Sequence, residues 1–322
     1  MSVSREASRG PARHPALRIA QYVLLAVALV FVALVLSRSW DDVQAFDWSF
    51  HPAWLVVSGL VILAFYTLQA FGWWLVLRAL ALHVPVRWAA AAWGQSIVAR
   101  YVPGNVFMFL GRALSSQRRG LDLRRLSAAM VYEQALAFCA ALVTLGLLFP
   151  FWEYHPGLMA LSLLGVPALL ALLHPRAFVP LADRLLRLLH REPLGAELRF
   201  GRVVALLCYY VAAWFVAGFA CWSLARAVAD VGIDALPAVT VAFAFAFVVS
   251  MVAVVFPGGL GVREVVLAGA LGNTLGAGVA LAWAVLLRLW QVAVELCFVG
   301  LATIVERAGR HETAESVETT ED

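Results

Sequence analysis

Residues 236–271 read LPAVTVAFAFAFVVSMVAVVFPGGLGVREVVLAGAL. The first 21 of them carry no charge, and about 20 apolar residues are enough for a helix to cross the roughly 30 Å of hydrocarbon in a bilayer. A Pro-Gly-Gly turn follows at Pro257, where a helix must break and the chain can reverse its direction. Arg263 and Glu264 come directly after the turn. An apolar run, a sharp break and two charges next to it indicate a membrane protein with a discontinuous helix.

The composition of the whole chain agrees with this interpretation. Of its 322 residues, 63% are hydrophobic and 14% are charged, and the mean hydropathy is +0.86. A soluble domain is about half apolar and about a quarter charged. A soluble globular protein is therefore excluded, and the expected fold class is an all-α polytopic membrane protein.

The loops between the apolar segments carry very uneven charge. The segments run over 19–36, 54–77, 89–111, 126–149, 158–173, 203–225, 236–256 and 277–305. Every basic residue is Arg, and 19 of the 24 lie in the N-terminal arm, the loops 78–88, 112–125 and 174–202, and the tail. Because arginine-rich loops favour the cytoplasmic side, both termini are predicted to be cytoplasmic and the protein to reside in the inner (cytoplasmic) membrane. The more acidic loops 37–53, 150–157 and 226–235 are predicted to face outward.

Two segments are predicted to enter the membrane and return. Segment 89–111 lies between two basic loops that belong on one side, and its middle holds the reversal signal Pro103-Gly104. The second reversal is predicted at the other Pro-Gly turn, formed by Pro257, Gly258, Gly259 and Gly261. The count is then about six full transmembrane helices plus two re-entrant hairpins, arranged as an inverted repeat with halves 19–149 and 158–305. The run 236–256 is long enough to span fully, so a complete crossing there stays open.

The ends of the chain are assigned by composition. Residues 1–18 form a basic cytoplasmic arm, and the run that follows is interpreted as a retained first helix because it lacks a small-residue cleavage site. Residues 19–305 form a single transmembrane domain, and the acidic tail 306–322 is expected to be disordered. The segment 176–191 alternates basic and apolar residues at helical spacing. It is expected either to lie on the anionic inner leaflet or to pack on the bundle as an ordinary amphipathic helix.

Six charged residues fall within the apolar segments or beside the second turn. They are Arg100, Arg263, Arg288, Glu133, Glu264 and Glu295. A charge near the bilayer centre costs at least about 2.5 to 3.5 kcal/mol, so such groups face the interior and are candidates for substrate contact. The alternative is a set of structural ion pairs that hold helices together.

The spacing of these charges suggests how they are arranged. Arg288 and Glu295 lie seven residues apart on the last helix and share a face with Gln291. Repeat symmetry suggests that Glu133 pairs with Arg288. Arg263 would stand near the N-terminus of a half-helix beginning at about Val262, where free N–H groups and a guanidinium favour an anion such as a phosphate.

Motifs of covalent or metal catalysis are scarce. The chain has no GxSxG, HExxH or Walker A motif, and its four Cys lack metal-ligand spacing. We therefore expect no enzyme activity, no metal and no cofactor. Most Trp residues, among them Trp73 and Trp88, are interpreted as interfacial aromatic belts.

Three motifs carry a resemblance to a known family: Tyr101-Val102-Pro103-Gly104 followed by Gly111-Arg112, then FPGGLGVRE over 256–264, then Leu286-Leu287-Arg288. The chain resembles the transmembrane (flippase) domain of lysylphosphatidylglycerol synthases over about residues 15–307. The resemblance implies a helical bundle with re-entrant elements that moves a phospholipid or lipid-linked head group between leaflets. It adds Arg112 to the candidate substrate-binding residues and does not imply the synthase activity.

The leading hypothesis is thus a lipid translocase that moves an anionic or modified phospholipid or lipid-linked head group. The first alternative is a non-catalytic scaffold or subunit for a lipid-modifying or glycosyltransferase partner, and the second is a secondary transporter of a small anion. The expected partners are a lipid substrate, the membrane, and either a second copy of the chain or a lipid-modifying enzyme, with no nucleic acid.

Overall fold

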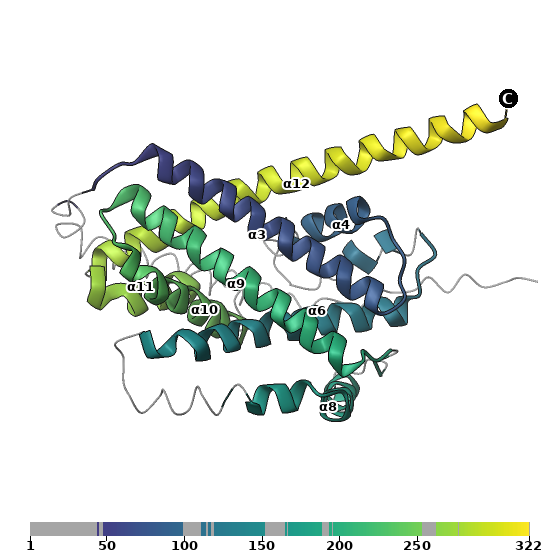
Figure 1. Ribbon diagram of the computed structural model, residues 1–322, viewed down its shortest axis with the longest axis horizontal. Coiled ribbons are helices and arrows are strands. Elements are labelled where there is room, and N and C mark those ends of the chain that lie inside the picture. Colours follow the sequence, from purple (N-terminus) through teal and green to yellow (C-terminus); the bar gives the residue numbers. More distant parts are fainter. Residues whose placement is uncertain are drawn as a thin grey trace, which may run out of the picture.

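The computed structural model describes residues 44, 48–98, 111–113, 115–116, 119–151, 165, 167–188, 193–194, 196–252, 262–275 and 277–321. Within these ranges the chain is helical and holds no strand, as Figure 1 shows. The expected all-α class is confirmed for this part of the protein.

Within the described part of the chain, five helices are long and apolar enough to cross a membrane. They are α3 (Pro52–Ala79), α6 (Leu123–Leu148), α9 (Phe200–Val228), α10 (Leu236–Val252) and α12 (Ala277–Glu321). Four of them coincide with predicted full spans, and the span on α10, over Ile233–Met251, covers most of the run predicted to begin the second hairpin. The predicted first span, 19–36, lies outside the described residues, as does most of 158–173. The count of six spans and two hairpins therefore stays a prediction.

The remaining helices are short. They are α4 (Val86–Val98), α8 (Pro175–Leu188), α11 (Val262–Leu275) and the 3₁₀ turns η2 (Phe149–Phe151) and η3 (Ile233–Ala235). With 13 and 14 residues, α4 and α11 are about 20 Å long, which is less than the hydrocarbon thickness. They lie next to the two predicted Pro-Gly turns, whose residues Pro103, Gly104, Pro257, Gly258, Gly259 and Gly261 all fall outside the described residues.

Helices α3 and α9 lie side by side and antiparallel at the centre of the bundle (Figure 1). Their close approach depends on Gly72, because a Cβ there would lie 2.8 Å from the Tyr210 ring. At one end the His51 N–H donates to the Ala227 carbonyl at 2.8 Å. At the other end Arg202 donates to the Ala79 carbonyl at 3.0 Å. Loops predicted to share a side of the membrane are thus adjacent at each end.

A second group of contacts joins the two loops that flank segment 89–111. The Arg119 guanidinium lies 5.1 Å from the centroid of the Trp88 ring and 3.7 Å from a carboxylate oxygen of Glu306. The loops 78–88 and 112–125 and the end of the last span therefore meet on one side of the bundle. This agrees with a segment that enters and returns, although the return itself lies outside the described residues.

The long helices exchange partners between the two predicted halves. Helix α6 packs against α9 and α10, and α12 packs against α3 and α4. Gly94 on α4 allows the second contact to be close, because its Cβ would lie 3.2 Å from Phe298 on α12. Such reciprocal packing is what an inverted repeat requires, and the repeat itself stays a prediction.

The last helix does not end at the predicted boundary of the tail. Helix α12 continues through Glu321 and extends beyond the other helices (Figure 1). Glu306, the first residue of the predicted tail, is only 7% exposed. Glu306 therefore packs against the bundle, and the end of the transmembrane domain at residue 305 stays a prediction.

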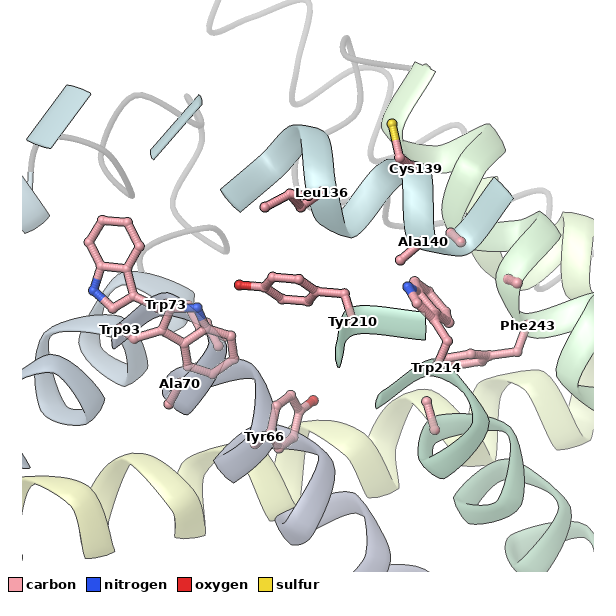
Figure 2. Close-up of a cluster of buried hydrophobic side chains, with 14 of the residues drawn as sticks. Tyr66, Ala70, Trp73, Trp93, Leu136, Cys139, Ala140, Tyr210, Trp214 and Phe243 are labelled. Atoms are coloured by element: carbon pink, nitrogen blue, oxygen red, sulfur yellow. The ribbon is translucent and has the colours of Figure 1, made fainter. Parts of the chain in front are cut away.

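Aromatic side chains fill the space where the halves meet. Tyr66 and Trp73 come from α3, Trp93 from α4, and Tyr210 and Trp214 from α9, and Figure 2 shows the Tyr210 hydroxyl pointing toward the two tryptophans Trp73 and Trp93. Trp73 is 1% exposed and Trp88 is 5% exposed. Their assignment to an interfacial belt is therefore wrong, and both belong to the core.

Candidate functional site

Among the described residues, two buried sites bring an Arg and a Glu together. We call the first-half site the group of Arg112, Glu133, Ser96, Trp93 and Trp73. We call the second-half site the group of Arg263, Glu264, Arg288 and Gln291. The two differ in how closely the charges are held.

The second-half site forms where α11 begins against the first third of α12. The first turn of α11 carries Arg263 and Glu264, and Arg288 reaches Glu264 with 3.6 Å between Nε and Oε1. Both side chains are nearly buried, with 11% of Arg288 and 8% of Glu264 exposed. The Arg263 guanidinium lies 4.4 Å from the centroid of the Phe243 ring on α10, a cation–π contact.

A small cavity lies among these side chains. Its volume is about 10 Å³, close to the minimum that holds one water molecule. Its lining consists of Arg263, Glu264, Leu267, Ala284, Leu287, Arg288 and Gln291. Two guanidinium groups and one carboxylate thus meet at a space inside the bundle.

Helical periodicity explains why α12 presents a polar stripe here. Gln291 is 8% exposed and Glu295 is 1% exposed, whereas Leu289 and Leu296 are 64% and 56% exposed. The stripe therefore faces the interior and the leucines face outward, as the spacing of Arg288, Gln291 and Glu295 predicts. The Tyr66 hydroxyl donates to Oε2 of Glu295 at 3.3 Å.

The first-half site is a closed hydrogen-bonded network. Arg112 contacts Glu133 with both terminal nitrogens, one of them at 3.5 Å from Oε1, and its Nε donates to the Ser96 hydroxyl at 2.7 Å. The Trp93 indole N–H donates to Oε1 of Glu133 at 2.7 Å. The Trp73 ring lies 4.6 Å from the guanidinium carbon. Only 3% of Arg112 and 5% of Glu133 is exposed, so every charge in the network is paired away from water.

The predicted pair of Glu133 with Arg288 is wrong. Glu133 pairs with Arg112, which lies in the short helical piece 111–113, and Arg288 pairs with Glu264. Each carboxylate therefore finds its partner within its own half rather than across the halves. The ion pairs form within each half because the segment after each turn packs on the next long helix of the same half. Arg100, also a candidate charge, lies outside the described residues.

Sequence reasoning missed the aromatic members of these networks. Trp93, Tyr66 and Trp73 hold or contact the buried charges, yet an aromatic residue in an apolar run has no feature that marks it as a hydrogen-bond donor. One signal was present on α3. Tyr66, Ala70, Trp73 and Leu77 recur at spacings of three and four residues, and all four are buried on one face.

The site offers no metal centre within the described part of the chain, where no group of three or more His, Cys, Asp or Glu side chains could hold an ion. The four cysteines are free, with Cys139 and Cys221 buried and Cys208 and Cys297 exposed. Guanidinium groups and a cavity next to them suit an anionic group rather than a cation.

These features define a helical, multi-pass membrane protein with two buried Arg–Glu sites in its interior. In a comparison with protein families, the model of the lysylphosphatidylglycerol synthase TM region matches residues 20–298. The chain belongs to this family, which confirms the expected resemblance. No curated protein matches the chain.

Proposed function

We propose that this protein is a lipid translocase, which moves an anionic or modified phospholipid or lipid-linked head group between the leaflets of the cytoplasmic membrane. The observation that carries the proposal is the second-half site, where Arg263 and Arg288 line one internal cavity at the start of a short helix. Membership in a family of membrane domains from lipid-modifying enzymes supports a lipid substrate.

The chemistry of the site fits a phosphate. A guanidinium forms paired, charge-assisted hydrogen bonds with phosphate oxygens, and the start of α11 adds the positive end of a helix dipole. Without substrate, Glu264 balances Arg288 at 3.6 Å. An arriving phosphate would compete with Glu264 for Arg288, so the charge inside the membrane would stay compensated at each stage.

The size of the cavity has a consequence for the transport cycle. About 10 Å³ accommodates one water molecule and not a phosphate. Substrate entry therefore requires α11 and α12 to separate, with the head group passing between them while the acyl chains stay in lipid. In this proposal the structure represents a closed state of the second-half site.

The test is leaflet exchange of fluorescent phospholipids in liposomes that contain the purified protein. The lipids should include anionic and aminoacylated head groups, and the variants are Arg263→Gln and Arg288→Gln. Arg125→Gln is the matched control, because Arg125 is 47% exposed and pairs with Asp122 outside the site. We expect exchange by the wild-type protein and the control, and its loss in both site variants.

Two other outcomes would overturn the proposal. No exchange above empty liposomes, from protein shown to be folded, would favour a scaffold for a lipid-modifying or glycosyltransferase partner. Arginine-dependent movement of a soluble anion without lipid exchange would favour a secondary transporter of small anions.

A further inference from the structure

A groove lies where three helical segments meet. Its residues are distant in the sequence from those of the second-half site. The helical piece 167–173, the start of α8 and the start of α9 border a shallow, open groove of about 410 Å³. Its lining consists of Leu170, Ala171, His174, Arg176, Ala177 and Phe200. None of these residues belongs to either Arg–Glu site.

The lining combines apolar walls with one cation at the edge. Leu170, Ala177 and Phe200 supply apolar surface, and the Arg176 side chain is exposed. The His174 ring lies 4.7 Å from the Phe200 ring, and its Nδ1 accepts the Arg176 backbone N–H at 3.3 Å. These contacts hold the first turn of α8 in place, so Arg176 is positioned at the mouth of the groove.

One face of helix α8 packs against the bundle. Phe178 is buried with its ring 5.0 Å from that of Tyr132 on α6. Leu194 is held against this helix as well, because its N–H donates to Asp183 at 2.6 Å. The groove is therefore bordered by a helix that is packed in place and not by a free loop.

Another part of the α8 surface is exposed and amphipathic. Leu181 is 43% exposed and Leu188 is 70% exposed, and the exposed Arg184 and Arg187 flank them. A helix that exposes leucines beside arginines lies stably at the boundary between head groups and acyl chains. The loop that contains α8 is also the one with the most arginines, and it is predicted to face the anionic cytoplasmic leaflet. Packing on the bundle, one of the two expectations for this segment, is confirmed by the buried Phe178, and contact of the exposed surface with the inner leaflet stays a prediction.

We propose that this groove binds an anionic phospholipid of the inner leaflet, with the phosphate on Arg176 and an acyl chain against Leu170, Ala177 and Phe200. The lipid is a resident one that holds α8 on the membrane, and it is separate from any lipid that the second-half site moves. Charge complementarity selects the occupant, because a single guanidinium above apolar walls matches a phosphate attached to a hydrocarbon chain.

The proposal is tested by the lipid that stays bound to the purified full-length protein. The protein is equilibrated in detergent with equal amounts of phosphatidylglycerol and phosphatidylcholine, and retained lipids are counted by native mass spectrometry. The variants are Arg176→Gln, which removes the phosphate contact, and Ala177→Trp, which fills the groove from an exposed position. Arg184→Gln is the matched control, an exposed arginine of the same helix that does not line the groove.

We expect the wild-type protein and Arg184→Gln to retain phosphatidylglycerol in preference to phosphatidylcholine. Arg176→Gln should lower that retention about fivefold, the effect of one arginine at a membrane surface, and Ala177→Trp should lower it at least as much. Because the altered side chains are exposed, all variants should unfold at the wild-type temperature.

Three results would overturn the proposal. Equal losses in Arg176→Gln and Arg184→Gln would indicate general attraction between α8 and lipid instead of a site. Equal retention of the two lipids by the wild-type protein would show that no anion is selected, and unchanged retention by Ala177→Trp would place the lipid elsewhere. Arg288→Gln, which should abolish leaflet exchange, should keep this lipid, so failure of the translocase proposal and failure of this one are distinguishable.

Discussion

The first-half and second-half sites each contain one Arg–Glu pair, with the two charges in opposite places, and the second-half site holds Arg263 in addition. In the first half the Arg follows the turn segment and the Glu lies on the next long helix, α6. In the second half Glu264 follows the turn segment and Arg288 lies on the next long helix, α12. The Arg112–Glu133 and Glu264–Arg288 pairs are thus charge-reversed counterparts. Two halves with related packing would produce this pattern if the packing required only that each pair be neutral.

The environments of the two pairs separate a structural role from a functional one. Each of the three guanidinium nitrogens of Arg112 donates a hydrogen bond, to Glu133 or to Ser96, and the guanidinium also lies over the Trp73 ring. Arg288 meets Glu264 at 3.6 Å beside a cavity and a second arginine. A fully satisfied buried pair rigidifies its surroundings, whereas a looser pair next to a space can exchange partners. Arg112 and Glu133, both candidates for substrate contact from the sequence, therefore fit a structural role better.

The largest expected effect follows from breaking the Arg112–Glu133 pair of the first-half site. Glu133→Gln should lower the free energy of unfolding by about 3–5 kcal/mol, because it leaves the Arg112 charge buried without a counter-ion. The measurement is chemical unfolding in mixed micelles. Glu264→Gln is the matched comparison and should cost clearly less, since its partner is more exposed and more distant. Equal losses in the two variants would contradict the distinction between the sites.

A charge exchange in the second-half site tests whether the pair or its orientation matters. Glu264→Arg alone places two like charges near Arg288 and should cost at least about 2 kcal/mol of unfolding free energy. Adding Arg288→Glu restores opposite charges in the order found in the first half, and should recover most of that loss.

Leaflet exchange by the charge-exchanged protein separates stability from transport. We expect exchange to remain low, because the guanidinium of the long helix has moved to the start of α11. Full recovery of exchange together with stability would mean that any opposite pair suffices, and would remove the argument for a phosphate on Arg288.

These comparisons also indicate how far the sequence alone could lead. Apolar length and Arg-rich loops predicted four of the five described spans and the grouping of the loops, because hydrocarbon thickness and charge cost act on each segment separately. The polar stripe of Arg288, Gln291 and Glu295 was predictable for the same reason, from the helical period. The partners in the ion pairs were not predictable from the sequence, since the choice between Arg112 and Arg288 for Glu133 depends on which helices pack together. The buried tryptophans were missed because packing decides whether an indole meets lipid or a carboxylate.

The next prediction, with a smaller expected effect, concerns the aromatic side chains of the first-half site. Trp93→Phe keeps an aromatic ring but removes the N–H that donates to Glu133 at 2.7 Å, together with part of the ring volume. A hydrogen bond to a charged group contributes about 1.5–3 kcal/mol, so the free energy of unfolding should fall by about that amount more than in a control that loses the same volume. Unfolding in micelles measures it, with Trp283→Phe in the second half as the control, because Trp283 is also buried and forms no hydrogen bond to a described residue. A larger loss in the control would assign the effect to ring volume instead of the hydrogen bond.

The smallest effect concerns the link between the two sites. Tyr66 donates to Glu295 at 3.3 Å and its ring lies 6.3 Å from that of Trp93, so it connects the stripe on α12 with the first-half site. Tyr66→Phe should lower the free energy of unfolding by about 1 kcal/mol, because the hydrogen bond is long and the ring stays in place. If the first-half site is a rigid support and α12 moves during transport, the Tyr66–Glu295 hydrogen bond must loosen when α12 shifts. Removing this hydrogen bond should therefore leave leaflet exchange as fast as in the wild type, or faster. Slower exchange in a stably folded Tyr66→Phe protein would instead make the hydroxyl part of the transport path. Tyr66 on α3 would then belong to the transporting region, and the rigid first-half support would begin at α4.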